Sequence, residues 1–151
     1  MKYTETASHR NTGSVVIVDD DLKDIRFTQR VIASVFPQLC TRGVQSGEEL
    51  IRYLQGENKF SNRTEFPYPI VVLLDLKMPG LNGFDVLRWV EDHPPHNLVA
   101  VVVLTVSGEV SLAQRAYKLG ARSFLTKPLT ANDFKNTISK FENALELVSR
   151  G

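Results

Sequence analysis

Five polar side chains follow strongly apolar runs of the sequence, and their types suit phosphate chemistry. Asp19 and Asp20 end the first of these runs, Asp75 the second, Thr105 the third and Lys127 the fourth. Carboxylates that gather at one place repel one another unless a cation lies among them, and carboxylate oxygens are ligands that Mg²⁺ prefers. We therefore expect the three aspartates to hold Mg²⁺, with few protein cations nearby.

The same residues suit the transfer of a phosphoryl group onto Asp75. An aspartate carboxyl is ionised near neutral pH, so it needs no general base to attack phosphorus. A bridging Mg²⁺ offsets the repulsion between the carboxylate and the phosphoryl oxygens. Lys127 can supply a point charge to one phosphoryl oxygen, and the hydroxyl of Thr105 can donate a hydrogen bond to another. We expect the protein to position groups and neutralise charge.

Each of these residues also has an ordinary structural interpretation. Acidic residues stabilise the start of a helix, and we assign that role to Asp21 as a cap and to Asp24 in the first turn. Asp75 alone would be a strand-end aspartate, Thr105 a β-branched strand residue and Lys127 a solvated lysine. The convergence of the polar strand ends at one edge of a sheet favours a site, because ligands of open parallel sheets bind beyond the carboxyl ends of the strands.

The apolar runs predict strands that are buried on both faces. They are rich in valine and barely alternate with polar residues, as in parallel sheets. A weaker run, Cys40–Gln45, predicts one more strand. The four strong runs are Ser14–Asp19, Ile70–Asp75, Leu98–Thr105 and Arg122–Lys127.

Apolar residues at helical spacing predict helices between these strands, and such alternation implies a parallel sheet with helices on both faces. Ser46 with Glu49, and Thr130 with Asp133, have the spacing of a capping box. The polar, proline-containing segment Gly56–Pro69 predicts a long loop. The expected helices follow the acidic cluster up to Pro37, follow Ser46 through Leu54, and occupy Gly83–Glu91, Glu109–Leu119 and Thr130–Leu145.

Composition fits one domain without a general affinity for nucleic acid or membranes. The chain has 151 residues, of which 42% are hydrophobic and 23% charged, with a net charge of +1. The single cysteine, Cys40, fits a reducing cytoplasm. No signal peptide or membrane-spanning run is visible, so we expect a cytoplasmic protein with a flexible segment at 1–13 and one domain at 14–149.

Four sequence blocks together resemble the receiver domain of two-component response regulators, the CheY-like family. They read VVIVDDD, VVLLDLKMPGLNGFDVL, VVVLTVSG and GARSFLTKPL, and they occur in the order of the family. The resemblance implies a doubly wound α/β fold with strand order 2-1-3-4-5 and five helices. The loop Gly56–Pro69 is longer than in minimal receivers, and in this respect the chain is similar to stand-alone regulators of the phytochrome-associated kind.

The resemblance also implies roles for individual residues. Asp75 matches the phospho-accepting aspartate, and Asp19 and Asp20 match the acidic pair, with Asp20 as the direct Mg²⁺ ligand and Asp19 acting mostly through water. The backbone carbonyl of Lys77 is the further expected Mg²⁺ ligand.

Switching is expected at the neighbouring strands. Thr105 matches the switch threonine, Phe124 the switch aromatic, Lys127 the site lysine, and Pro128 the proline that follows a cis peptide bond. A sensor histidine kinase or phosphotransfer protein is the implied phosphoryl donor. The implied contact for a downstream partner or a homodimer is the surface of the fourth expected helix, Glu109–Leu119, the last strand, Arg122–Lys127, and the last helix, Thr130–Leu145. This surface includes Val110, Ala113, Tyr117, Phe124 and parts of Thr130–Leu145.

Two other functions remain open from the residues. A Mg²⁺-dependent phosphatase of the haloacid-dehalogenase type would use an aspartyl nucleophile, but it needs a second aspartate two positions later, where this chain has Lys77. An interaction module with an inactive site is the other alternative. The receiver interpretation predicts a signalling domain that catalyses only its own phosphorylation and dephosphorylation.

Overall fold

Valine-rich strands form the centre of the structure, a computed structural model that describes residues 13–141. They make one parallel sheet in the order β2-β1-β3-β4-β5, as predicted. Residues 1–12 of the expected N-terminal segment lie outside the described residues. The weaker predicted strand is present at the edge. The bounds are β1 Ser14–Val18, β2 Cys40–Val44, β3 Val71–Leu74, β4 Ala100–Thr105 and β5 Ser123–Thr126.

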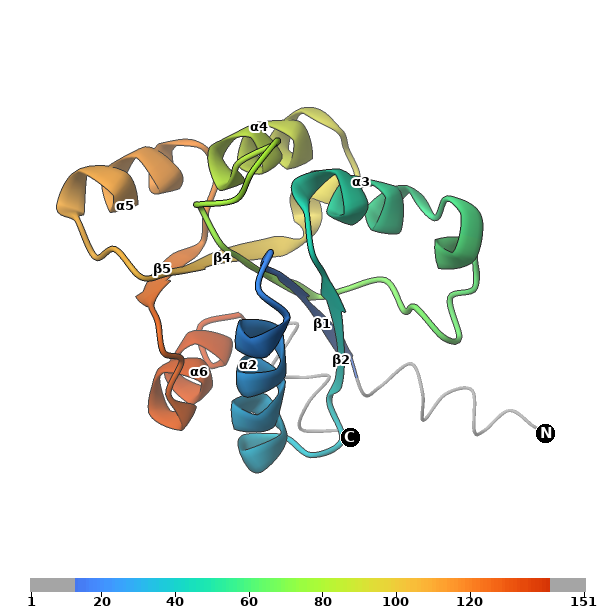
Figure 1. Ribbon diagram of the computed structural model, residues 1–151, viewed down its shortest axis with the longest axis horizontal. Coiled ribbons are helices and arrows are strands. Elements are labelled where there is room, and N and C mark those ends of the chain that lie inside the picture. The colour runs from blue at the N-terminus through green and yellow to red at the C-terminus, as the bar shows by residue number, and fades with distance from the viewer. Residues whose placement is uncertain (1–12, 142–151) are drawn as a thin grey trace.

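Helices cover both faces of this sheet. Figure 1 shows α3, α4 and α5 on one face and α2 and α6 on the other. Within residues 13–141, every helix is too short or too polar to cross a bilayer. The α-helices are α2 Leu22–Val35, α3 Gly47–Gln55, α4 Gly83–Asp92, α5 Val110–Lys118 and α6 Ala131–Ile138, and two 3₁₀ helices are η1 Asn58–Ser61 and η2 His96–Leu98.

The two layers of helices explain why the strands do not alternate with polar residues. Val16 and Val18 of β1 pack into the core beneath α3, α4 and α5. Val15 and Ile17 of the same strand point to the core beneath α2 and α6. Because successive side chains of a strand point to opposite faces, a strand between two helical layers needs apolar residues at every position.

Both predicted capping boxes, at Ser46 and at Thr130, form the bond to the cap side chain but not the return bond. The Ser46 hydroxyl accepts the backbone N–H of Glu49 at 3.0 Å, but the Glu49 carboxylate accepts the N–H of Gln45 at 2.8 Å. The predicted box at Ser46 is therefore wrong in its return bond. The complete two-way box starts α4, where Asn82 and Asp85 each accept the other's backbone N–H.

The last helix is shorter than its apolar pattern predicts. Thr130 caps it by accepting a backbone N–H three residues later, and α6 ends at Ile138. Phe134 and Ile138 are fully buried, and Phe141 packs against the same core. Leu145, the last residue of the predicted stripe, lies outside the described residues.

The predicted long loop contains a turn of 3₁₀ helix and is bound to α3. The Arg63 guanidinium donates to the carbonyls of Tyr53 at 2.9 Å and Leu54 at 3.0 Å. The Tyr53 ring lies 4.9 Å from that of Phe60, measured between centroids. Arg63 thus gives a charged donor to the Leu54 carbonyl and a second donor to the Tyr53 carbonyl, which also accepts the Gly56 N–H at the end of α3.

Candidate functional site

Backbone hydrogen bonds extend the sheet by one residue and hold the predicted site residues at its carboxyl edge. The Asp75 N–H donates to the carbonyl of Val18 at 3.0 Å, and the Lys127 N–H donates to that of Thr105 at 2.8 Å. Asp19 is held in the same way, at 3.1 Å from the last carbonyl of β2. Segments far apart in the sequence therefore place their polar residues at one edge, as predicted.

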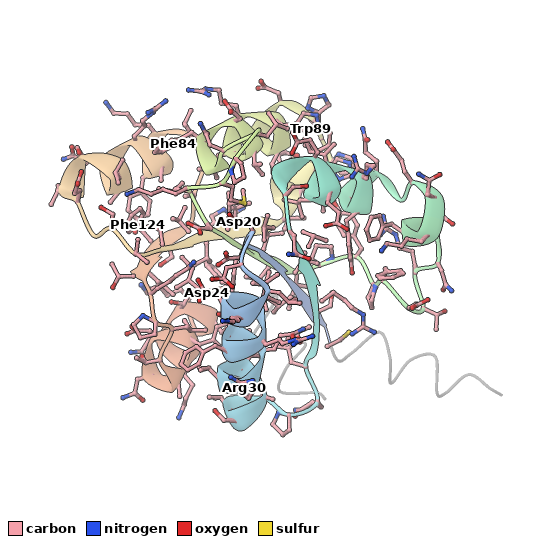
Figure 2. All side chains as sticks on the ribbon, viewed as in Figure 1. Asp20, Asp24, Arg30, Phe84, Trp89 and Phe124 are labelled. Carbon is pink, nitrogen blue, oxygen red and sulfur yellow. The ribbon has the colours of Figure 1, made fainter. Side chains whose placement is uncertain are left out.

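Three carboxylates gather there in a geometry that fits a divalent cation. One oxygen each from Asp19, Asp20 and Asp75 lie within 4.8 Å of one another, and this is the only such group of three or more acidic, histidine or cysteine residues among residues 13–141. Asp19 and Asp75 are buried and Asp20 is exposed. Figure 2 shows Asp20 where the chain passes from β1 towards α2. Oxygen ligands with one open side suit Mg²⁺, which keeps several waters.

A protein cation lies among these carboxylates, contrary to the expectation of few cations nearby. The Lys127 ammonium donates to Asp19 at 2.6 Å, to Asp24 at 2.9 Å and to Asp75 at 3.1 Å. Burial alone would lower the pKa of Lys127, but the hydrogen bonds that it donates to the three carboxylates outweigh this effect and raise the pKa above its ordinary value. Lys127 therefore remains protonated at neutral pH.

Burial shifts the pKa of Asp19, one of the carboxylates that contact Lys127, in the opposite direction. It raises the pKa of Asp19 above its ordinary value, and the hydrogen bonds from Lys127 and from the Asp21 N–H offset only part of this effect. A carboxylate in this environment gains from any further cation that approaches it, so the electrostatics of the site favour a bound divalent ion.

Asp24 is a site residue that sequence reasoning missed. We assigned it to the first turn of a helix, and it does lie in the first turn of α2. Its bond to Lys127 joins residues 103 positions apart. No local pattern of the sequence signals a contact of this kind, although the pairing of strands that carries Lys127 to the same edge was predictable.

Thr105 lies at the site with a hydroxyl that has no partner. Its side chain is fully buried, and among the described residues its Oγ1 is the only buried side-chain polar atom without a hydrogen-bond partner. Leaving a buried hydroxyl unpaired is unfavourable by about 1–3 kcal/mol. Such an orphaned group at a site edge is suited to bind a ligand oxygen.

The loop after Asp75 is held close to the end of β3. The Lys77 N–H donates to Asp75 Oδ1 at 3.2 Å, and the Lys77 side chain is exposed. A Cβ atom at Gly83 would lie 2.6 Å from the Cα of Leu76 and 2.7 Å from the carbonyl oxygen of Asp75. Only glycine allows this close approach of the loop to the end of β3.

Phe124 lies on β5, and Lys127 and Pro128 follow this strand directly. Phe124 is partly buried against the core beneath α3, α4 and α5, and Figure 2 shows it on the α5 side of the molecule. The Lys127–Pro128 peptide bond is cis, as predicted. A second cis bond, Pro94–Pro95, was not predicted. The movement of Phe124 as a switch stays a prediction.

Two histidines belong to a ring stack at the opposite end of the sheet. The Trp89 ring lies 4.2 Å from that of His93 and 5.4 Å from that of His96, with nearly parallel planes. His96 also stacks on Tyr68, whose hydroxyl hydrogen-bonds its Nδ1. Trp89 therefore has a packing role in this stack.

Comparison with known proteins gives one consistent family. The family described as "Response regulator receiver domain" matches residues 15–139. A Rhizobium etli protein named as a probable chemotaxis protein CheY is 32% identical over 87% of this chain and 94% of its own length. Some other curated relatives are longer proteins, and the chain spans 58% of one and 32% of another.

Solved structures of similar proteins agree in fold. The bacteriophytochrome response regulator AtBRR is 30% identical, with a TM-score of 0.75 over 86% of this chain and 92% of that chain. The Mn²⁺-bound form of the response regulator Rcp1 is 28% identical, with a TM-score of 0.70 over 86% of this chain and 94% of that chain. These regulators share the doubly wound architecture described above.

Proposed function

The chain belongs to the response regulator receiver family, and from this premise we propose that Asp75 accepts a phosphoryl group from a histidine kinase or phosphotransfer protein. The observation that carries the proposal is the meeting of Asp75, the Lys127 ammonium and the unpaired hydroxyl of Thr105 at one edge of the sheet. These groups offer a nucleophile, a cation and a hydrogen-bond donor at the same edge of the sheet. In this proposal the receiver domain spans residues 14–149.

Mg²⁺ is the proposed cofactor of the reaction. Asp20 and Asp75 would ligate it directly, Asp19 would act mostly through water, and the backbone carbonyl of Lys77 would be a further ligand. The oxygen-only donor set and the grouping within 4.8 Å support this assignment. A bound divalent ion supplies charge neutralisation where two anionic groups must approach each other.

The residues of the chain have separate roles in the transfer. A carboxylate oxygen of Asp75 forms the new P–O bond, the P–O or P–N bond to the donor breaks, and the leaving group keeps that electron pair. Lys127 stabilises the negative charge on one phosphoryl oxygen, and Thr105 donates its hydroxyl hydrogen to another. In this proposal the chain is a signalling domain that catalyses its own phosphorylation and dephosphorylation.

The proposed output is a change of the surface formed by α5, β5 and α6. Rotation of Thr105 towards the phosphoryl group would leave space that Phe124 enters from its partly buried position. Val110 and Tyr117 on α5 are 70% and 50% exposed, so they are available to a downstream partner or to a second copy of the chain.

Acetyl phosphate tests the acceptor directly. The protein is incubated with acetyl phosphate and Mg²⁺, and intact-mass spectrometry should show one added phosphoryl group. Asp75→Ala should abolish the addition, as should removal of Mg²⁺ by a chelator. Asp92→Ala is the matched control, because Asp92 is an exposed aspartate at the end of α4, away from the site. A label that survives in Asp75→Ala at the wild-type level would refute the assignment.

A further inference from the structure

The three hydrogen bonds of Lys127 use its full donor capacity. A protonated lysine has three N–H donors and no acceptor. In the structure, Asp19, Asp24 and Asp75 each accept one of them, at distances between 2.6 and 3.1 Å. If Lys127 is to bind a phosphoryl oxygen, one of these three carboxylates has to give up its hydrogen bond.

Asp24 differs from the other two partners. Asp19 and Asp75 belong to the group of carboxylates suited to a metal, whereas Asp24 does not. Its side chain is 44% exposed, compared with 5% for Asp19 and 9% for Asp75. It lies in the first turn of α2, which Figure 2 shows beneath the loop that carries Asp20. Asp24 is therefore the partner that water can replace with the smallest loss.

Stabilisation of the helix start does not explain the contact. Asp21 already caps α2 by accepting the N–H of Lys23 at 2.9 Å, and a carboxylate anywhere in the first turn interacts favourably with the helix dipole. Asp24 instead holds the ammonium of a residue that follows β5. Asp24 and Lys127 also line the same open pocket of about 230 Å³, so their bond lies where solvent and small anions have access.

We propose that Asp24 is a positioning residue that competes with the phosphoryl group for Lys127 and thereby slows phosphorylation of Asp75. The inference rests on the proposed function. Asp24 makes and breaks no covalent bond in the transfer. It exchanges its hydrogen bond from the ammonium for one from water as the phosphoryl oxygen takes its place.

The formal charge of the site also predicts that Asp24 slows the approach of an anionic phosphoryl group. Four carboxylates, those of Asp19, Asp20, Asp24 and Asp75, and one ammonium carry four negative charges and one positive, a formal charge of −3. A divalent cation brings this charge to −1, and removal of Asp24 would bring it to zero. Loss of Asp24 should therefore favour an approaching anion and weaken attraction for Mg²⁺. A purely structural role would not move the two affinities in opposite directions.

Asp24→Asn is the test, with Asp21→Asn as the matched control. Both changes remove one carboxylate from the start of α2, and asparagine remains a good cap at position 21, where the side chain does not contact Lys127. At saturating Mg²⁺, Asp24→Asn should be phosphorylated by acetyl phosphate about two- to fivefold faster than wild type, the range expected for a partly exposed ion pair. Beryllofluoride should bind more tightly by a similar factor, and Mg²⁺ alone should bind more weakly. Asp24→Glu should restore most of the wild-type behaviour.

The outcomes separate this inference from the proposed function. If wild type takes up no phosphoryl group, the proposed function fails whatever the variants do. If wild type is labelled but Asp24→Asn is equal or slower, or if Asp21→Asn gives the same acceleration, the inference is overturned. Nitrogen-15 NMR of the lysine ammonium tests the contact without phosphorylation. Hydrogen exchange of the Lys127 ammonium with water should be faster in Asp24→Asn than in wild type and Asp21→Asn, and equal rates would contradict the proposal.

Discussion

Replacement of Thr105 by valine should make the protein more stable and less able to respond to a phosphoryl group. Valine has nearly the shape of threonine, remains β-branched and suits a strand, so β4 should keep its conformation. The change removes the one buried side-chain polar atom without a partner in residues 13–141. Stability and activity are therefore expected to change in opposite directions.

The size of the stability change follows from the burial of the hydroxyl. Thr105 is 0% exposed, so Oγ1 has lost its hydrogen bonds to water without gaining one in the protein. The loss amounts to about 1–3 kcal/mol, and a buried methyl group in its place adds about 0.8 kcal/mol of hydrophobic stabilisation at most. Thr105→Val should thus raise the free energy of unfolding by about 1–3 kcal/mol. For a chain of this size the melting temperature should rise by about 2–4 °C per kcal/mol.

Urea unfolding measured by circular dichroism, without Mg²⁺, gives the stability, and beryllofluoride titration with Mg²⁺ gives the response. Beryllofluoride stands for the phosphoryl group on Asp75. Wild type should be stabilised by beryllofluoride, and Thr105→Val should gain much less from it because the hydroxyl donor is missing.

Thr137→Val is the matched control. Thr137 is also buried, at 2% exposure, but its hydroxyl is not among the buried atoms without a partner. This variant should gain no stability and should keep the response to beryllofluoride. If Thr105→Val is less stable than wild type, or if it responds to beryllofluoride as wild type does, the reasoning about the orphaned hydroxyl is wrong.

Two further predictions concern regions away from the site. Arg63→Met should lower the free energy of unfolding by about 2–3 kcal/mol in urea titration, because the carbonyls of Tyr53 and Leu54 lose charged donors. The same substitution at Arg88, whose ion pair with Asp85 is exposed, should cost less than about 1 kcal/mol, and equal losses would show that Arg63 does not hold the loop. Burial lowers the pKa of His96 below its ordinary value, and the charges of His93 and Arg63 lower it further, so the folded state favours the neutral ring. As the pH falls through about 6.5, the unfolded chain therefore binds more protons than the folded chain does. The free energy of unfolding should then decrease from about pH 7.5 to about pH 5.5, and the melting temperature measured across this range follows the decrease. His96→Gln should flatten this dependence while His93→Gln retains it, and identical curves for wild type and His96→Gln would contradict the assignment.

The fold could be predicted because its determinants are local or periodic. The valine-rich runs predicted the central strands. The weaker run that starts at Cys40 could also be predicted as a strand, because the edge of a parallel sheet needs fewer buried apolar residues than its centre. Helix lengths were less predictable, as the early end of α6 at Ile138 shows. An apolar stripe indicates which face of a segment is buried, but the packing of the whole core decides how far the helix continues.

The site was predictable to the level of which residues meet, and less so in how they pair. Parallel strand ends bring Asp19, Asp75 and Lys127 to one edge, and that follows from the topology. The hydrogen bond between Asp24 and Lys127 depends on the angle at which α2 leaves the sheet, which no residue type reports. The sequence also did not predict that the Glu49 carboxylate accepts the N–H of Gln45 and not that of Ser46, since neighbouring backbone N–H groups are equally suitable donors.

The backbone bonds that continue the sheet past β3 and β5 also make the site a test of strand pairing. Side chains of a strand alternate between faces, so a β3 strand paired one residue out of place would present Leu76 where Asp75 belongs. Lys127 would then lack one of its three acceptors. A chain with misaligned strands could still be compact, but under the proposed function it would not be phosphorylated. Uptake of a phosphoryl group would then count the molecules in a preparation that have reached the native alignment, which bulk spectroscopy of secondary structure does not distinguish.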